Sequence, residues 1–239
     1  MSKSIIITSV LVALLSASCA SLGKLSRHDF ESGFYKLKVQ GTAPSSVYTE
    51  VTADSIIVYP VASDGKNKFP DTSTSNSARI SRIKKDNYFY KSSFTNNSID
   101  IDLTSIIFKS RHSRDDVPNQ FSADLDIAVY AGFRKDFYNI VSPVHPFQED
   151  KSFIRQIGFD LGVFAGIGSS PVNPTVTNNL VSQEYDAMIF QKGFAGFISI
   201  NKISVGLAVG FDNLFDKSRS LWIYNQKPYL GLIISVSSF

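Results

Sequence analysis

The sequence lacks an apolar run long enough to cross a bilayer as an α-helix, for which about 20 consecutive apolar residues are needed. The apolar segment at its start, from Ile5 to Leu15, is shorter and is interrupted by Thr8 and Ser9. Lys3 precedes this segment and small residues follow it, which is the pattern of a secretory signal peptide. We therefore predict that residues 1–18 are a signal peptide.

Cysteine is almost absent. Cys19 is the only one in the chain, so neither a disulfide nor a cysteine-rich metal site can form within one chain. The residues from Leu15 to Cys19 resemble a bacterial lipobox, in which the cysteine is acylated and becomes the first residue of the mature protein. Ser16 stands where leucine is commonest in that motif. Lipidation of Cys19 is the favoured interpretation, and ordinary cleavage near Ala20 is the alternative.

An excess of one charge sign is also lacking, because 24 lysine and arginine residues face 21 aspartate and glutamate residues. The basic cluster from Arg79 to Lys85 is short, and a solvated surface is a commoner role for it than contact with anionic lipid. The three histidines, His28, His112 and His145, do not share the spacing of metal ligands. We expect no nucleic-acid partner, no metal and no cofactor.

What the sequence does contain is alternation. From Phe121 to Phe133, apolar residues alternate with Ser122, Asp124, Asp126, Ala128, Tyr130 and Gly132. A period of two is the pattern of a strand with one apolar and one polar face. Average hydropathy near zero does not argue against a membrane location, since barrels hide their apolar surface in this alternation.

Six segments in the second part of the chain repeat the pattern strongly. Besides residues 121–133, they are residues 98–104, 157–168, 185–200, 203–212 and 230–236. The alternation in residues 185–200 is interrupted in phase at Gln191-Lys192-Gly193. The set predicts an all-β fold, a small antiparallel β-barrel of the outer-membrane type. Since about eight strands is the usual minimum, we assign the missing pair to Tyr88–Phe94 and one N-terminal strand.

Turn lengths give the predicted barrel a direction. Ile200 and Ile203 flank a two-residue turn, and outer-membrane barrels keep short turns on the periplasmic side. The loops at residues 110–120, 169–182 and 214–227 then share the outer end. Aromatic residues near that end are expected to form an interfacial girdle, namely Phe211, Phe215, Trp222, Tyr224 and Tyr229.

The N-terminal part is predicted to be a short β-rich extension. Residues 33–40, 48–52 and 55–61 have the composition of strands, and Ala53-Asp54 suits a hairpin turn. The polar, turn-rich stretch from Gly65 to Ser77 is the best candidate for a boundary. We therefore expect a tether and hairpin region at residues 19–77 and the barrel at residues 78–239.

Charged side chains are expected inside the predicted barrel. Six aspartates fall on inward faces, with Arg134, Lys109 and Arg111 near strand ends. Carboxylates held this close need cationic partners or water. A salt-bridged plug is the favoured interpretation, and a cation-selective path is the alternative. The predicted polar network comprises Asp100, Asp102, Asp124, Asp126, Asp160, Asp212 and Arg134.

Several segments resemble a family of uncharacterised bacterial outer-membrane-type proteins, often with a lipoprotein-like start. They are FKSR at Phe108–Arg111, VYAGFRKD at Val129–Asp136, GVFAGIG at Gly162–Gly168, EYDAMIFQKGFAG at Glu184–Gly196 and GFDNLFDKSRSLWIYNQKPYLGL at Gly210–Leu232. The resemblance covers roughly Gly33 onward and implies a small outer-membrane barrel. It carries no catalytic or binding residues.

Three functions remain open at this point. The first is a lipid-anchored outer-membrane barrel with a structural or accessory, non-catalytic role, in contact with outer-membrane lipid and presenting the loops at residues 169–182 and 214–227 to another envelope protein. The second is a periplasmic, lipocalin-like barrel with apolar faces inside around an apolar ligand. The third is a lipid-modifying enzyme that uses His112 or His145, with residues such as Ser113, Asp115 and Asp116.

Acylation of Cys19 is directly testable. Intact mass of the membrane-extracted protein should show a mature chain that begins at a lipid-modified Cys19, because the short apolar run ends in small residues before it. Cys19→Ala should lose the lipid mass. A mature chain that begins at Ala20 or later would contradict the prediction.

Overall fold

The computed structural model describes residues 30–39, 41–52, 55–65, 67–73, 77–81, 92–124, 126–141, 153–201 and 203–236. The predicted signal peptide, Cys19, Leu125, His28 and His145 lie outside these residues. The described part is all-β, with twelve strands in one sheet and two short 3-10 helices. No helix among the described residues is long and apolar enough to cross a membrane.

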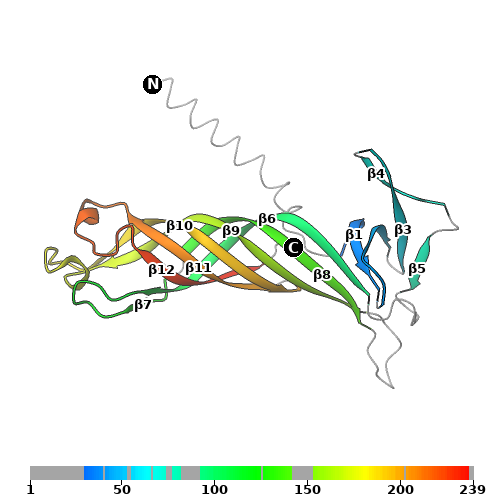
Figure 1. Cartoon of the computed structure of the whole chain (residues 1–239). Helices are drawn as coiled ribbons and strands as arrows, with labels where there is room; N and C mark the ends of the chain where they lie inside the picture. The colour runs from blue at the N-terminus through cyan, green and yellow to red at the C-terminus, as the bar shows by residue number, and fades with distance from the viewer. Residues whose placement is uncertain are drawn as a thin grey trace, which may run out of the picture.

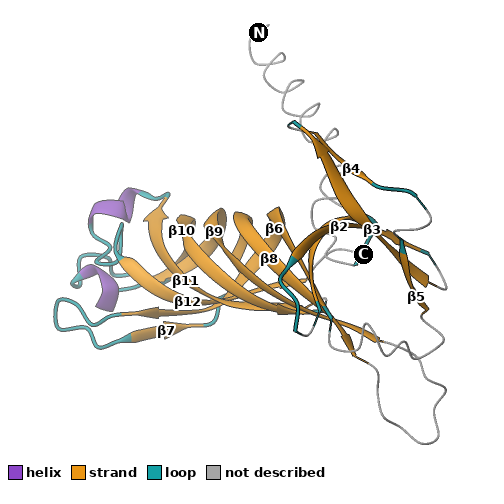
Figure 2. Ribbon diagram, turned by 45° about the vertical axis from the view of Figure 1, so that its right-hand side comes forward, coloured by secondary structure: helices purple, strands orange, loops and turns teal. Residues whose placement is uncertain are grey.

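Six long strands form a closed ring (Figures 1 and 2). Each is antiparallel to its neighbours. The last strand pairs with the first, from Tyr229 opposite Arg111 to Ser235 opposite Thr104, which closes the ring. The strands are β6 (Ser93–Arg111), β8 (Asp126–Val141), β9 (Phe153–Val172), β10 (Tyr185–Ile200), β11 (Ile203–Leu214) and β12 (Pro228–Val236).

The ring therefore has six strands where the sequence led us to expect about eight. Of the separate strand that we assigned to Tyr88–Phe94, residues 88–91 lie outside the described residues, whereas Ser93 and Phe94 are the first residues of β6, a single strand of 19 residues. The N-terminal strand β1 (Gly33–Lys38) does pair with β6, but only at Ser93–Thr95, beyond the part of β6 that pairs with β12. It extends the sheet without entering the ring.

The N-terminal extension continues the sheet beyond β1 through β2 (Ser45–Val51), β3 (Ser55–Asp64) and β4 (Asn67–Pro70). β2 and β3 are antiparallel neighbours, as expected for the hairpin. β5 (Ala78–Ser81) pairs with β3, so these residues lie with the extension although a boundary at residue 77 would assign them to the ring.

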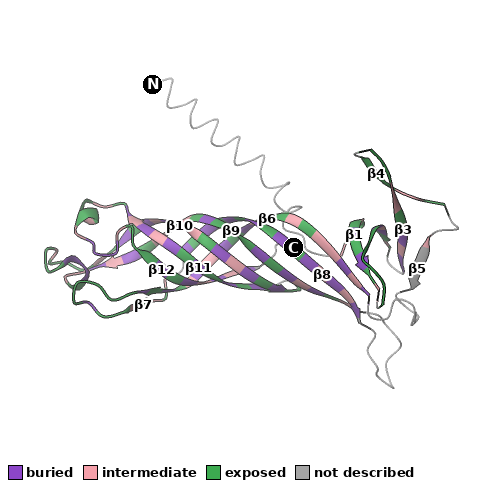
Figure 3. Ribbon diagram, in the orientation of Figure 1, coloured by how far each residue is buried: buried purple, intermediate pink, exposed green. Residues whose placement is uncertain are grey.

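The two faces of the ring differ sharply (Figure 3). Most side chains that point outward along the middle of the ring are apolar and exposed, for example Phe133 at 79%, Leu161 at 69% and Leu207 at 73%. Those that alternate with them are buried. The phase of β10 is continuous, because Gln191 is fully buried and Lys192 is exposed, so the expected interruption is absent.

Three apolar clusters follow one another along the molecule. The base cluster joins the extension to the ends of β6, β8 and β9, and includes Tyr35, Phe94 and Tyr138. Burial there raises the pKa of Tyr35 to about 12. A middle cluster lies within the ring around Tyr130 and Phe197. The third forms a cap at the far end.

The cap is built from the loops that follow β9 and β11, together with residues near Val117. Its two 3-10 helices span Thr175–Thr177 and Lys217–Ser220. The amide of Ile223 donates to the carbonyl of Val176, at 3.1 Å, which links the two loops. The three loops predicted to share one end of the molecule therefore do so.

Candidate functional site: the charged interior of the ring

Four charged side chains meet inside the ring near the cap. The Lys109 amine lies 2.6 Å from Asp126 and 3.0 Å from Asp212, and the Arg111 guanidinium donates to Asp212 at 2.6 Å. All four are at least nine-tenths buried. They come from β6, β8 and β11, and since β11 is not a neighbour of β6, the contacts cross the interior. Two cations thus balance two carboxylates.

A bulge in β6 turns Lys109 and Arg111 inward. Asp100, Asp102 and Thr104 alternate as inward-facing residues in the first part of the strand. The register with β12 then shifts, so that Leu232 is opposite Phe108 and the next residue, Ile233, is opposite Ile106. An extra residue of this kind reverses which side chains face each way. Without the bulge, the two cations would face outward.

A second polar cluster lies nearer the base. The Arg134 guanidinium contacts Asp136 at 3.0 Å and Asp100 at 3.4 Å, and Gln156 donates to Asp136 at 2.9 Å. The Tyr130 hydroxyl donates to Asp160 at 2.6 Å. Charged groups buried away from water need ion-pair and hydrogen-bond partners, and Arg134 is such a partner for both Asp100 and Asp136.

The structure buries six of the seven residues predicted for the polar network inside the ring, where there are two clusters rather than one. Asp102 accepts a hydrogen bond from Ser235 at 2.8 Å, and the other five take part in the two clusters. Asp124 does not join them: it is half-buried in the segment between β7 (Gln120–Ser122) and β8. The single strand predicted across residues 121–133 is interrupted there, since one strand ends at Ser122 and the next begins at Asp126, with Asp124 in neither.

Sequence reasoning missed other members of the interior. Asp136 is two residues beyond Arg134 in the same inward phase, so extending the predicted strand past Phe133 would have found it. Gln191 is fully buried and accepts a hydrogen bond from Tyr229 at 3.1 Å. We had placed Tyr229 in an outward aromatic girdle, and its burial contradicts that assignment.

Trp222 and Tyr224 were also assigned to the girdle, and both are buried in the cap. The Arg111 guanidinium lies 5.6 Å from the Trp222 ring and 5.7 Å from the Tyr224 ring, within the range of cation–π attraction. Burial raises the pKa of Tyr224 above its ordinary value. Arg111 therefore connects the interior charges to the cap. Only Phe215 of the five is exposed.

The interior is crowded. A Cβ added at Gly168 would lie 1.6 Å from Asp126 Oδ1, and one added at Gly210 would lie 2.4 Å from the Tyr229 ring. Because these glycines have no side chain, Asp126 can occupy the space beside Gly168 and Tyr229 the space beside Gly210. A ring of six strands is narrower than one of eight, in which side chains already fill the interior. The interior is therefore a packed core, in which the polar clusters and the middle apolar cluster together fill the space.

The loop after β6 does not assemble a hydrolase site. Asp115 and Asp116 have φ of 49° and 64°, and the amides and carbonyls of Arg114 and Val117 bond across them. Positive φ at both central residues is typical of a type I′ turn, in which aspartate is a favoured residue, so the turn accounts for this pair. His112 is exposed, beside a pocket that Ser110 and Asn119 line without a carboxylate. The described residues contain no group of three metal-ligating side chains.

Comparison of the chain with protein-family models, with curated proteins and with solved structures found no match.

Charge balance in the cluster near the cap is testable. Lys109→Met should lower the free energy of unfolding by about 3–5 kcal/mol, because it leaves Asp126 without the cation beside it. Lys109→Met with Asp126→Asn should recover most of that loss, since Asp212 keeps Arg111. Denaturant titration followed by circular dichroism measures both.

Lys227→Met, at an exposed position, is the control and should change little. Equal losses in the single and the double variant would show that the charge imbalance is not the cause.

Proposed function

We propose that the ring is a small β-barrel that spans the bacterial outer membrane, with a structural or accessory role and no catalytic activity. One observation carries the proposal: the outward side chains form an apolar belt around all six strands, while the inward ones combine ion-paired polar clusters with the middle apolar cluster. A soluble sheet would place these faces the other way, with its apolar side chains inside.

The height of the belt suits a bilayer. Outward apolar residues run from Phe159 to Ile167 on β9 and from Ile203 to Phe211 on β11, each a stretch of nine residues. A tilted transmembrane strand needs about 9–11 residues to cross the hydrocarbon core. The belt is thus of the height that this location requires.

One cation stands within the belt. Lys192 is exposed on β10 and is opposite Phe211, the last belt residue of β11 on the cap side. A long side chain at the edge of an apolar region can extend its amine into the polar layer while its methylenes remain in contact with lipid. Its place near the cap-side rim is therefore compatible with the proposal.

The barrel that we propose has six strands, fewer than the eight of the smallest common outer-membrane barrels. This small number favours a closed interior over a pore, because the charged and aromatic side chains already occupy the space. It disfavours the lipocalin-like alternative for the same reason, since an apolar ligand would need a roomy apolar interior.

We further propose that a lipid on Cys19 anchors the chain on the same membrane. In this arrangement the N-terminal extension lies on the periplasmic side, together with the short turn between β10 and β11. The cap then faces outward and is the surface available to an envelope partner. Its ordered packing around Trp222 supports a defined shape for such a contact.

The proposal predicts how a charge in the belt acts. Leu207→Arg should lower the stability of the folded protein in lipid vesicles by about 2–4 kcal/mol, because the guanidinium would enter the hydrocarbon region. Reversible urea unfolding in vesicles measures this change.

Leu180→Arg is the matched control, since Leu180 is 67% exposed but belongs to the cap. It should change stability by less than about 0.5 kcal/mol. A small effect at both positions would argue against lipid around Leu207.

A further inference from the structure

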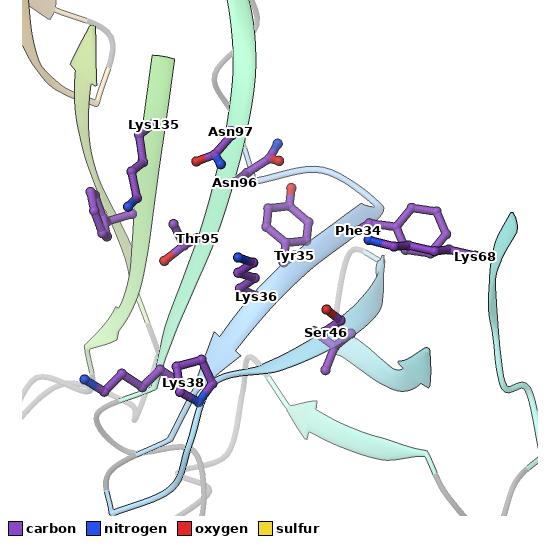
Figure 4. A pocket seen from close by; sticks show the side chains of 13 residues that line it. Phe34, Tyr35, Lys36, Lys38, Ser46, Lys68, Thr95, Asn96, Asn97 and Lys135 are labelled. Atoms are coloured by element: carbon purple, nitrogen blue, oxygen red, sulfur yellow. The ribbon is translucent and has the colours of Figure 1, made fainter. Parts of the chain in front are cut away.

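A lysine-lined groove lies where the N-terminal extension meets the ring (Figure 4). It has a volume of about 390 Å³. Four lysines line it, Lys36 and Lys38 from β1, Lys68 from β4 and Lys135 from β8, and its lining contains no carboxylate. The neighbouring aspartates, Asp100 and Asp136, are buried on the inward face and pair with Arg134 instead.

Strand register sets this arrangement. Lys36 is opposite Thr95, which is in turn opposite Phe137, so the three form one row across β1, β6 and β8. Asn97 and Lys135 form the adjacent row. Figure 4 shows Lys36 and Lys135 on either side of Thr95. Cationic and hydrogen-bonding side chains therefore converge on one outward face.

The groove adjoins the lower edge of the apolar belt. On β8 the outward residue after Phe133 is Lys135, and on β6 the outward residue below Ile99 is Asn97. Lys135 is also opposite Phe159, the first belt residue of β9, and its amine lies 5.4 Å from the Phe137 ring. Apolar and cationic surfaces thus meet at one level of the molecule.

We propose that this groove binds the phosphodiester headgroup of an anionic glycerophospholipid from the periplasmic leaflet. This inference rests on the proposed function, because the acyl chains would lie along the belt above the groove. Lys36 and Lys135 neutralise the phosphate, while Thr95 and Asn97 supply hydrogen-bond donors from the strand between them. The exposed faces of Phe34 and Phe137 contact the glycerol and upper acyl carbons.

The side chains that line the groove explain why a lipid is favoured over free phosphate. Four lysines without a carboxylate attract any phosphate, but the aromatic wall and the adjoining belt stabilise only a ligand that also carries apolar chains. The two contributions act on different parts of one amphipathic molecule. An anionic lipid satisfies both at once.

The test uses the full-length protein in nonionic detergent and titrates it with short-chain phosphatidylglycerol, short-chain phosphatidylcholine and inorganic phosphate. Phosphatidylglycerol should bind more tightly than either of the others, and salt should weaken its binding. Lys36→Gln with Lys135→Gln should weaken it about 30-fold. Lys217→Gln with Lys227→Gln, an equal change of charge on the cap, should leave it unchanged.

Each other outcome overturns the inference. Equal binding of phosphatidylcholine would mean that the groove recognises only the apolar part of a lipid. Equal binding of inorganic phosphate would mean a phosphate site without a preference for lipid. Equal loss in the cap variant would mean attraction to net charge alone. Insertion into vesicles is measured on the same variants. A protein that inserts but does not prefer phosphatidylglycerol would contradict the proposed groove and leave the proposed function standing, whereas a protein that does not insert would contradict the proposed function.

Discussion

The pairing of β12 with β6 is the constraint on which the rest of the structure depends. Closure leaves the ring strands without free edges over the paired region and separates an inside from an outside. Because side chains alternate along every strand, closure assigns each residue to one of two environments. It turns Asp126, Lys109 and Asp212 toward one another, and it leaves Leu161 and Leu207 with no protein neighbour to cover them.

The narrowness of the ring then determines what the interior can hold. Carboxylates enclosed with so little space for water need cations or hydrogen-bond donors at contact distance. Lys109, Arg111 and Arg134 pair with Asp126, Asp212, Asp100 and Asp136, while hydroxyls donate to Asp160 and Asp102. Glycine is needed where the larger side chains cross, as at Gly168 beside Asp126. The same crowding makes the interior a structural core, which leaves the outer belt, the cap and the groove below the belt as the surfaces that meet other molecules.

Local alternation predicted the part of the fold that depends on one strand at a time. It identified the all-β class, the long strands and the inward phase of Asp126, Tyr130 and Asp160. It missed features that depend on two strands together. The bulge opposite Ile233 that turns Lys109 inward, and the early junction of β1 with β6 that leaves six strands in the ring, appear only once pairing is known. The prediction for the cap was wrong for a related reason. Trp222 is of a residue type that is common in an aromatic girdle, but it packs against loops that are distant in sequence.

The central claim is that the apolar belt faces lipid, and spin-label accessibility in lipid vesicles tests it most directly. In a Cys19→Ser background, single cysteines at Leu161, Val163, Val205 and Leu207 would be labelled, with Leu180 as the reference on the cap. Labels in the belt should collide readily with oxygen, which dissolves in the bilayer, and rarely with a water-soluble nickel chelate, while the label at Leu180 should show the reverse. Belt labels that collide freely with the nickel chelate, or that are shielded from both reagents as beneath a protein partner, would contradict the account.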